Sequence, residues 1–355
     1  NLDGVFDMKS FDVNADGLND LVFVTWQGHT LYTSLRNSDG GLGIPEPITS
    51  VLSYPEGCSV GDMDGDGDGD AIALNRSGHS VYWVAFEDFE FGTSSTLIVN
   101  RNYPTYAESV DFDSDGDTDL LVTHHNDGLW AYSNNGDGTS WEETQIMVGG
   151  NHSNEIQTIW VGDSFHVFSR NGTQVLHATL DTGVWTYEIS HTLTGLSSFA
   201  VTYAIENDTW QLYTSSASTL SLLNATGTPN NWEATTETNI DSDYRYINIP
   251  ANIEADSDEI FILGSVYHPH RLWLHALPLE SEVPALSIGS TSISGGYPLQ
   301  FVQADSDTEE EIVLRSGSSF VLFDLQSDGL WDDGHTIMNG VLSYFLDHAD
   351  IDNDG

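Results

Sequence analysis

The sequence predicts an all-β fold, a β-propeller of seven four-stranded blades, and three observations lead to this prediction. A nine-residue acidic pattern recurs at steps of about 50 residues, beginning at Asp12, Asp62 and Asp111. Each copy runs directly into a short apolar stretch that is typical of a strand buried on both faces. From Asp12 to Asp350, where the pattern begins again, the chain contains seven periods of about 48 residues, the length of four strands and their turns.

The acidic pattern places side-chain oxygens at positions 1, 3, 5 and 9, a glycine at position 6 and a backbone carbonyl at position 7. Ca²⁺ prefers hard oxygen ligands, and glycine permits the tight turn that brings them together. The sequence therefore predicts about three well-formed calcium sites. The predicted ligands are Asp12, Asn14, Asp16, Leu18 and Asp20, then Asp62, Asp64, Asp66, Asp68 and Asp70, then Asp111, Asp113, Asp115, Asp117 and Asp119.

The EF-hand is the rival calcium motif, because it shares positions 1, 3, 5 and 6. It also needs a bidentate glutamate at position 12 and a helix on each side. Position 12 is instead Phe23, Ala73 or Val122, and strand-like segments follow at residues 21–24, 71–74 and 120–123. The loops are therefore expected to join two β-strands. Ordinary acidic turns without a metal are the alternative, which three full copies disfavour.

Weaker copies extend the repeat toward the C-terminus. One has lost a residue at 252–259, another spans residues 303–311, and a third begins at Asp350. These copies predict one or two weaker calcium sites. Their candidate ligands are Gln303, Asp305, Asp307, Glu311, Asp350, Asp352 and Asp354. Two further repeats are expected near residues 158 and 205, where segments 159–168 and 203–213 read as hairpins with short turns in place of the metal loop.

Composition limits the function. The 355 residues carry a net charge of -47, from 8 Lys and Arg against 55 Asp and Glu, so phosphate would repel the chain and nucleic acid is excluded as a partner. A hydrophobic content of 39% suffices for a packed core. The acidic excess suits a salty or calcium-rich medium. Cys58 is expected to be a small core residue. The sequence shows no run of 18 apolar residues and does not open on a basic-then-apolar signal, so either a mature fragment or a soluble piece of the protein is expected.

With these motifs, the chain resembles the FG-GAP or VCBS repeat family, which builds the integrin alpha-subunit head propeller, bacterial surface proteins and a seven-bladed fungal lectin. The resemblance covers essentially the whole chain, strongly over residues 1–140 and weakly over 150–300. It implies a calcium ion in the hairpin loop between the first two strands of a blade. It also implies that ligands meet the opposite face of the propeller.

The two ends of the chain both supply a strand before a loop, at residues 5–11 and 341–349. One of them suffices to close seven blades. Either the spare strand pairs to close the ring, or the native protein continues into an eighth blade or another domain. We expect residues 1–355 to form one propeller domain of seven blades in a longer parent chain, with eight blades as the alternative.

The few arginines share one position. Arg76, Arg170 and Arg315 each stand two residues before a glycine, and the equivalent turns carry Trp26, His124 and His268. Because one strand of about six residues separates this turn from the metal loop, the set is expected on the face opposite calcium. It would bind an acidic or hydroxyl-rich ligand, or the arginines would instead pair with aspartates of adjacent blades. A transition-metal site at the histidines lacks a third ligand at a matching spacing.

These features predict an extracellular or cell-surface module for recognition or adhesion, lectin-like, that binds Ca²⁺ and a surface glycan or an extracellular protein. A structural repeat unit of a surface layer or filament, formed by self-assembly, is the first alternative. The sequence contains no nucleophile elbow, zincin helix, Walker loop or Rossmann glycine pattern. We therefore expect no enzymatic activity, with a polysaccharide lyase-like action on acidic glycans as the minority interpretation.

Overall fold

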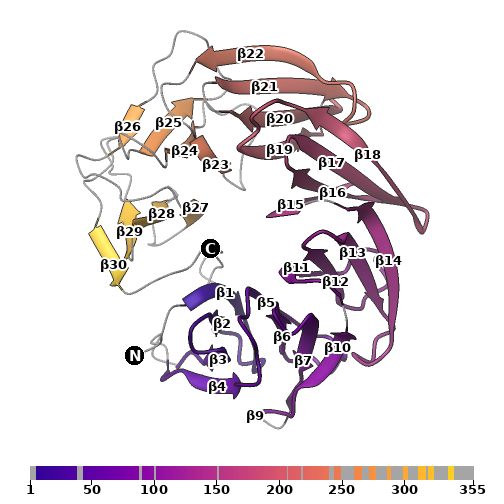
Figure 1. The fold of residues 1–355 in the computed structure, drawn as a ribbon, viewed down its shortest axis with the longest axis vertical. Helices are drawn as coiled ribbons and strands as arrows, with labels where there is room; N and C mark the ends of the chain where they lie inside the picture. Colours follow the sequence, from indigo (N-terminus) through magenta and orange to yellow (C-terminus); the bar gives the residue numbers. More distant parts are fainter. Residues whose placement is uncertain are drawn as a thin grey trace. The chain divides into compact units, whose positions relative to one another are not determined.

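The computed structural model describes residues 5–37, 43–87, 90–99, 101–149, 152–205, 207–216 and 219–239, and after these the strands of the last two sheets. The described residues form strands and turns grouped in small antiparallel sheets (Figure 1). Among them there is no helix, and hence none of the length and hydropathy needed to cross a membrane. The chain divides into two compact units, one with the described residues up to 154 and one with those from 155 to 339.

The first unit contains three four-stranded sheets, in which strands that follow one another in the chain pair antiparallel. In the second sheet a short hairpin of β8 and β9 stands between the third and fourth strands. The strands are β1 (Val5–Phe11), β2 (Asp20–Thr25), β3 (Thr30–Ser34) and β4 (Glu46–Thr49); β5 (Gly57–Gly61), β6 (Asp70–Asn75), β7 (Ser80–Val84), β8 (Phe86–Glu87), β9 (Glu90–Phe91) and β10 (Ser95–Val99); and β11 (Pro104–Val110), β12 (Asp119–His124), β13 (Gly128–Asn134) and β14 (Trp141–Val148).

The other four sheets repeat the same order of strands. The strands are β15 (His152–Val161), β16 (Ser164–Asn171), β17 (Gln174–Asp181) and β18 (Val184–Thr192); β19 (Ser198–Ala204), β20 (Thr209–Ser215), β21 (Thr219–Thr226) and β22 (Glu233–Asn239); β23 (Tyr244–Asn248), β24 (Ile260–Ser265), β25 (Leu272–Ala276) and β26 (Leu286–Ile288); and β27 (Leu299–Val302), β28 (Glu311–Ser316), β29 (Ser319–Phe323) and β30 (His335–Asn339).

The strands predicted after the three acidic loops are confirmed as β2, β6 and β12. Strands β6 and β12 are buried along their whole length, as continuous apolar runs predict. The predicted hairpins at 159–168 and 203–213 are also confirmed, as β15–β16 and β19–β20. Seven four-stranded sheets occur in the described chain. Their closure into one ring of seven blades, and the single domain over residues 1–355, stay predictions.

Short turns with favourable chemistry set the register of these hairpins. Between β17 and β18, Thr182 and Gly183 have φ values of 49° and 78°, the type I′ combination whose twist matches that of paired strands. Asp181 pairs with Val184 directly across the turn. A two-residue turn of this type fixes which side chains face the core along both strands.

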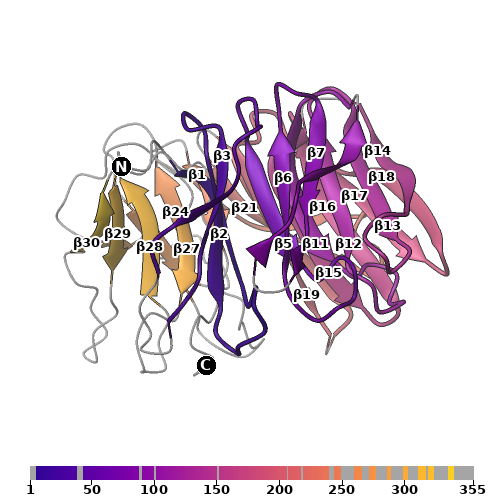
Figure 2. The same ribbon diagram turned by 90° about the horizontal axis from the view of Figure 1, so that it is seen from below.

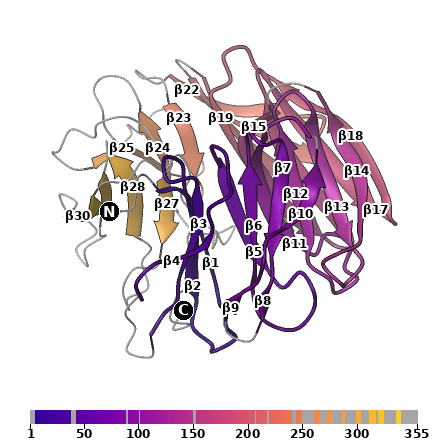
Figure 3. The ribbon, with the colours of Figure 1, turned by 60° about the horizontal axis from the view of Figure 1, so that its bottom comes forward.

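The three sheets of the first unit pack through their innermost strands, with β5 lying beside both β1 and β11. Strands β5, β6 and β7 run side by side in Figure 2 and Figure 3. Cys58 on β5 is fully buried in the core between the first two sheets, so its predicted core position is confirmed. Its backbone N–H donates to Asp7 Oδ2 at 2.9 Å, and Ser59 Oγ lies 2.6 Å from Ser109 Oγ of the third sheet.

In the second unit, Trp210 on β20 lies at the centre of a core shared by the sheets of β15–β18 and β19–β22. The side chain is 1% exposed, and its ring lies 5.6 Å from the Phe168 ring and 4.8 Å from the Tyr203 ring, centroid to centroid. The indole N–H donates to the Gly227 carbonyl at 3.1 Å. Trp210 thus combines a large buried apolar area with a satisfied polar group.

Candidate functional site

Each acidic loop of the first unit is wound around the carboxylate at its first position. The Oδ2 atoms of Asp12, Asp62 and Asp111 accept hydrogen bonds from the backbone N–H of the glycine at position 6, at 2.8, 3.0 and 3.2 Å. These glycines have φ between 89° and 98°, a left-handed conformation that disfavours other residues. The aspartate at position 1 and the glycine at position 6 thus give the three loops the same local turn.

The aspartate at position 9 closes each loop. Asp20, Asp70 and Asp119 are fully buried, and each uses both carboxylate oxygens to accept backbone N–H groups. One N–H comes from position 2 of the same loop. The other comes from a residue near the end of the third strand of the sheet: Arg36 and Phe86 follow that strand, and Asn134 is its last residue. The donors are Val13 and Arg36 (3.0 and 2.6 Å), Met63 and Phe86 (2.9 and 2.9 Å), and Phe112 and Asn134 (3.1 and 2.8 Å).

Burial and mutual repulsion make these carboxyl groups hard to ionise together. Burial raises the pKa of Asp70 to about 6 and of Asp119 to about 7. The pKa of Asp68 rises to about 7, first through burial and then through the charge of Asp66. Burial also raises the pKa of Asp20. The carboxylates of each loop thus lie close enough to repel one another when ionised. Among the described residues, no Lys or Arg side chain lies within the loops to balance this charge.

The second and third loops fit a Ca²⁺ ion. Asp62, Asp64 and Asp70 each offer one oxygen within 4.8 Å of the others, as do the aspartates at positions 1, 3 and 5 of the third loop. Among the described residues, buried oxygens of Asp64, Asp68 and Asp111 accept no hydrogen bond. Oxygen-only donors with open lone pairs suit a hard divalent cation. In the first loop Asn14 occupies position 3, and its Oδ1 accepts the Asp16 N–H at 3.1 Å.

The predicted ligands of the weaker calcium sites have no described side chains. Glu311 is the first residue of β28, and its side chain is not described. The other predicted ligands lie outside the described residues, namely Gln303, Asp305, Asp307, Asp350, Asp352 and Asp354. The strand predicted at residues 341–349 also lies outside them.

At the opposite ends of β2 and β6, two clusters of aromatic and basic side chains lie at the surface. In the first cluster, the Tyr54 ring lies 4.7 Å from the His29 ring and 5.8 Å from the Trp26 ring, both edge-on. The Tyr54 N–H donates to His29 Nδ1 at 3.0 Å, which makes Nε2 the protonated nitrogen of a neutral His29. Tyr54 is 49% exposed.

The second cluster repeats the first one sheet later. The Tyr103 ring lies 4.5 Å from the His79 ring, and the Tyr103 N–H donates to His79 Nδ1 at 3.4 Å. Arg76 places its guanidinium 5.5 Å from the Tyr103 ring centroid and forms an ion pair with Glu56 at 2.9 Å. We call the two clusters together the turn face. It comprises Trp26, His29, Tyr54, Arg76, His79 and Tyr103.

Sequence reasoning missed the two tyrosines and His79, whereas His29 stands in the predicted turn that begins at Trp26. A signal exists: a Tyr-Pro pair stands just before β5 and another leads into β11, and a histidine is the fourth residue of both turns. Tyr54 and Tyr103 also have positive φ, at 48° and 40°, which is rare and costly for an aromatic residue. Such strain is visible only in three dimensions, and it concentrates at functional sites.

The candidate ligand residue His124 is corrected by the structure. Its side chain is fully buried, and Nε2 lies 3.2 Å from the Tyr132 hydroxyl, so it cannot meet a ligand. Burial lowers the pKa of His124 to about 3, which keeps it neutral. His124 is the last residue of β12, in which every residue is buried, whereas the next residue, His125, begins the turn and is partly exposed, 6.3 Å from the Tyr103 ring.

The other two predicted arginines lie within strands, and not in turns as the sequence predicted. Arg170 lies within β16, where it pairs with Val175, rather than in a turn. Arg315 lies within β28, and its side chain is not described. His268 lies outside the described residues. Arg101, which the sequence did not single out, stacks 3.4 Å above the Trp130 ring and pairs with Glu143 and with Asp127.

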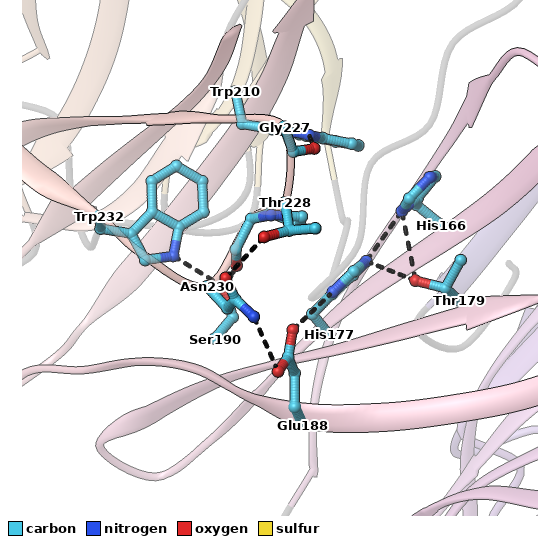
Figure 4. A network of polar contacts seen from close by, with 11 residues as sticks. His166, His177, Thr179, Glu188, Ser190, Trp210, Gly227, Thr228, Asn230 and Trp232 are labelled. Atoms are coloured by element: carbon cyan, nitrogen blue, oxygen red, sulfur yellow. Dashed lines mark hydrogen bonds and ion pairs between the residues drawn. The ribbon is translucent and has the colours of Figure 1, made fainter. Parts of the chain in front are cut away.

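A separate polar network joins two sheets of the second unit (Figure 4). His166 Nδ1 lies 2.9 Å from His177 Nε2, with the two rings stacked, and Thr179 Oγ1 lies 3.0 Å from the same Nε2. Glu188 lies 3.8 Å from His177 Nδ1 and accepts the Asn230 amide at 3.1 Å. The pair supplies two histidines, whereas zinc sites use three or four protein ligands, and neither histidine belongs to a group of three or more metal-ligating side chains in the described part of the chain. The network is a polar link between sheets.

This histidine pair predicts a loss of stability in acid. Burial lowers the pKa of His166 to about 4 and of His177 to about 3, so the folded state binds fewer protons than the unfolded chain below pH 6.5. Stability is expected to fall as pH drops from 6.5 toward 4, by about 2 kcal/mol per neutral histidine at pH 5. Denaturant unfolding at pH 7 and pH 5 measures the effect.

The comparison that isolates the pair uses His177→Gln, which should flatten this pH dependence, against His125→Gln, which should not. The charged group facing the pair is Glu188 on β18, while β20 presents the apolar ring of Trp210. Carboxylates elsewhere titrate equally in both variants and cancel in the difference. An unchanged slope in His177→Gln would contradict the assignment.

Two comparisons of sequence bear on the acidic loops. The model of the FG-GAP-like repeat matches residues 12–73 and 111–164, which contain the three complete loops. No curated protein sequence matches the chain.

Solved structures share the fold. Dihydro-heme d1 dehydrogenase NirN is 14% identical over 95% of this chain and 67% of its own, with a TM-score of 0.58. The Dos1 propeller is 11% identical over 90% of this chain and 75% of its own, with a TM-score of 0.54. A lectin of Agrocybe aegerita that recognises non-reducing terminal N-acetylglucosamine is 10% identical over 94% and 80%, with a TM-score of 0.50. At these identities the similarity shows the fold alone.

The expectation that this chain is not an enzyme is corrected by the same comparison. Besides NirN, a putative 6-phosphogluconolactonase of Bacteroides fragilis is 11% identical over 93% of this chain and 98% of its own, with a TM-score of 0.55. The fold therefore carries enzymes as well as binding proteins. Because a fold alone does not fix function, the absence of familiar nucleophile and nucleotide motifs does not exclude an enzymatic activity.

Proposed function

This chain is a β-propeller that carries FG-GAP-like repeats, and from that premise we propose that it is a calcium-stabilised recognition module. The module acts outside the cell or at its surface and binds its ligand on the turn face. The observation that supports the proposal most strongly is the repeated contact between an exposed tyrosine and a histidine. It occurs at the ends of β2 and β6 that lie away from the acidic loops. Its ligand is a glycan in the first place and an extracellular protein in the second.

Calcium has a structural role in this proposal. The ion would bind the carboxylates of the second and third loops and neutralise repulsion within each loop. In the first loop Asp12, Asp16 and Asp20 would do the same, with Asn14 as a neutral ligand. Millimolar calcium and high ionic strength outside cells suit a chain with a net charge of -47.

The chemistry of the turn face favours a neutral, hydroxyl-rich ligand over an acidic one. Arg76 is already paired with Glu56, and Arg101 nearby with Glu143, so neither guanidinium offers an unbalanced positive charge. The remaining groups are the exposed tyrosine rings and the Nε2–H donors of His29 and His79. Aromatic rings stack on the apolar faces of sugars, while such donors bind hydroxyl groups.

A glycan-array screen in millimolar calcium tests the proposal. Tyr54→Ala and Tyr103→Ala are each expected to weaken binding by roughly tenfold, since each removes one aromatic contact. Tyr187→Ala is the matched control, because Tyr187 on β18 is 48% exposed and lies in the other unit. Selective binding of neutral glycans with this pattern supports the proposal.

Two outcomes argue against parts of it. Binding that survives both Tyr54→Ala and Tyr103→Ala would move the ligand away from the turn face. If the folded, calcium-loaded chain binds no glycan on the array, the glycan proposal is wrong and a protein ligand remains. Binding of candidate proteins would then be compared between the wild-type chain, Tyr54→Ala and Tyr103→Ala.

A further inference from the structure

The second and third acidic loops touch one residue in common, Asn134. It is the last residue of β13, where the turn to β14 begins, and it is 2% exposed. Its side-chain amide donates to the Met63 carbonyl at 2.6 Å and to the Thr118 carbonyl at 3.0 Å. Met63 is position 2 of the second loop, and Thr118 is position 8 of the third. One side chain therefore ties both loops by their backbones.

The other polar groups of Asn134 hold it in place. Its Oδ1 atom accepts the N–H groups of Gly136 and Gly138 at 3.2 and 3.3 Å, and its backbone N–H donates to Asp119 Oδ1 at 2.8 Å. A fully satisfied, buried amide has one orientation, because every alternative leaves a buried donor or acceptor unpaired. Asn134 thus connects a predicted ligand of the third loop to the backbone of the second.

Two glycines bring the loops close enough for this connection. A Cβ atom on Gly61 would lie 2.9 Å from Thr118 Cγ2, and one on Gly138 would lie 2.8 Å from the Trp83 ring and 3.3 Å from the Met63 carbonyl oxygen. Real Cβ atoms essentially never lie within 3.0 Å of another atom, so a side chain at either position would force Thr118 or Trp83 to shift. The two glycines therefore permit the close approach of the segments that Asn134 connects.

We propose that Asn134 couples calcium binding in the second loop to calcium binding in the third, so that the two loops take up their ions cooperatively. The inference rests on the calcium binding proposed above. A bound ion fixes the second loop, including the Met63 carbonyl that Asn134 contacts through Nδ2. Because Asn134 also bonds to the Thr118 carbonyl and to Asp119, the third loop is then already restrained and loses less conformational entropy when it binds its own ion.

Repulsion between the two ions does not cancel this effect. Each loop carries five aspartates, at positions 1, 3, 5, 7 and 9. A bound divalent ion therefore leaves each loop with a net negative charge, so each ion meets a negative rather than a positive neighbouring loop.

Calorimetric titration of the calcium-free full chain with Ca²⁺ tests the coupling. The wild-type chain is expected to show a cooperative phase with a Hill coefficient clearly above 1, and Asn134→Ala should reduce it to about 1. Asn135→Ala is the matched control, because this neighbouring amide is exposed and bonds only within its own turn, to Ser140. Cooperativity that persists in Asn134→Ala, or that is absent from the wild-type chain, overturns the inference.

A second measurement covers the case in which Asn134→Ala does not fold. Asp66→Ala removes a ligand of the second loop, and hydrogen exchange then reports calcium protection of residues 111–119. The coupling predicts that half-maximal protection of the third loop needs about tenfold more calcium in Asp66→Ala than in the wild-type chain. An unchanged calcium requirement overturns the inference but leaves the proposed function standing, whereas absence of any calcium binding overturns both.

Discussion

Removal of calcium with EDTA is expected to abolish most of the hydrogen-exchange protection of the acidic loops and the strands that flank them, β1, β2, β5, β6, β11 and β12. Each site that is saturated at 100 times its dissociation constant contributes about 2.7 kcal/mol to folding, so three sites amount to a large share of the stability of a domain. The hairpins β15–β16 and β19–β20 have short turns instead, and residues 155–239 should change little.

Hydrogen exchange with mass spectrometry in calcium and in EDTA measures this difference along the chain. Magnesium at equal concentration is the control, since the smaller ion demands a rigid octahedral site and should restore little protection. Equal loss of protection in residues 5–149 and 155–239 would contradict a structural role that is confined to the loops.

Asp119→Ala is expected to destabilise the chain strongly both with and without calcium, whereas Asp113→Ala should do so only with calcium. Asp119 accepts two backbone N–H groups, from Phe112 and Asn134, in a fully buried place. Its removal leaves both donors unsatisfied, at a cost of about 1–3 kcal/mol each, before any metal is considered. Asp113 is exposed, and it accepts hydrogen bonds from the Ser133 hydroxyl and from the Asp115 backbone N–H within its own loop.

Urea unfolding of both variants in calcium and in EDTA separates the two roles of the loop. The wild-type chain in each buffer is the reference. If Asp119→Ala and Asp113→Ala lose the same stability in EDTA, the position-9 carboxylate has no role beyond binding the ion, and our account of loop closure is wrong.

The local part of the structure was predictable because it depends on short stretches of chain. The glycine at position 6 and the aspartate at position 1 define the loop within five residues, and the apolar run after Asp70 defines β6. The replacement of the metal loop by a short turn near residue 160 was predictable as well, since strand patterns flank Gly162 and Asp163 directly.

The rest depends on contacts between segments that are distant in sequence. That His124 is buried and His125 partly exposed follows from where β12 ends, which the repeat pattern alone does not fix. The bonds of Asn134 to Met63 span 71 residues, and a sequence shows only another polar turn there. The pairing of Tyr54 with His29 likewise needs two loops, separated by 25 residues, to meet.

The hairpin of β15 and β16 has a consequence for the whole architecture. There Gly162 and Asp163 alone connect two strands that, in the first sheet, are joined by the acidic loop between Phe11 and Asp20. The connection between these strands is thus an exchangeable part, so a calcium site proposed for one hairpin need not occur in the next. Evolution, or a protein engineer, can add or delete it one hairpin at a time without redesigning the strands that carry it.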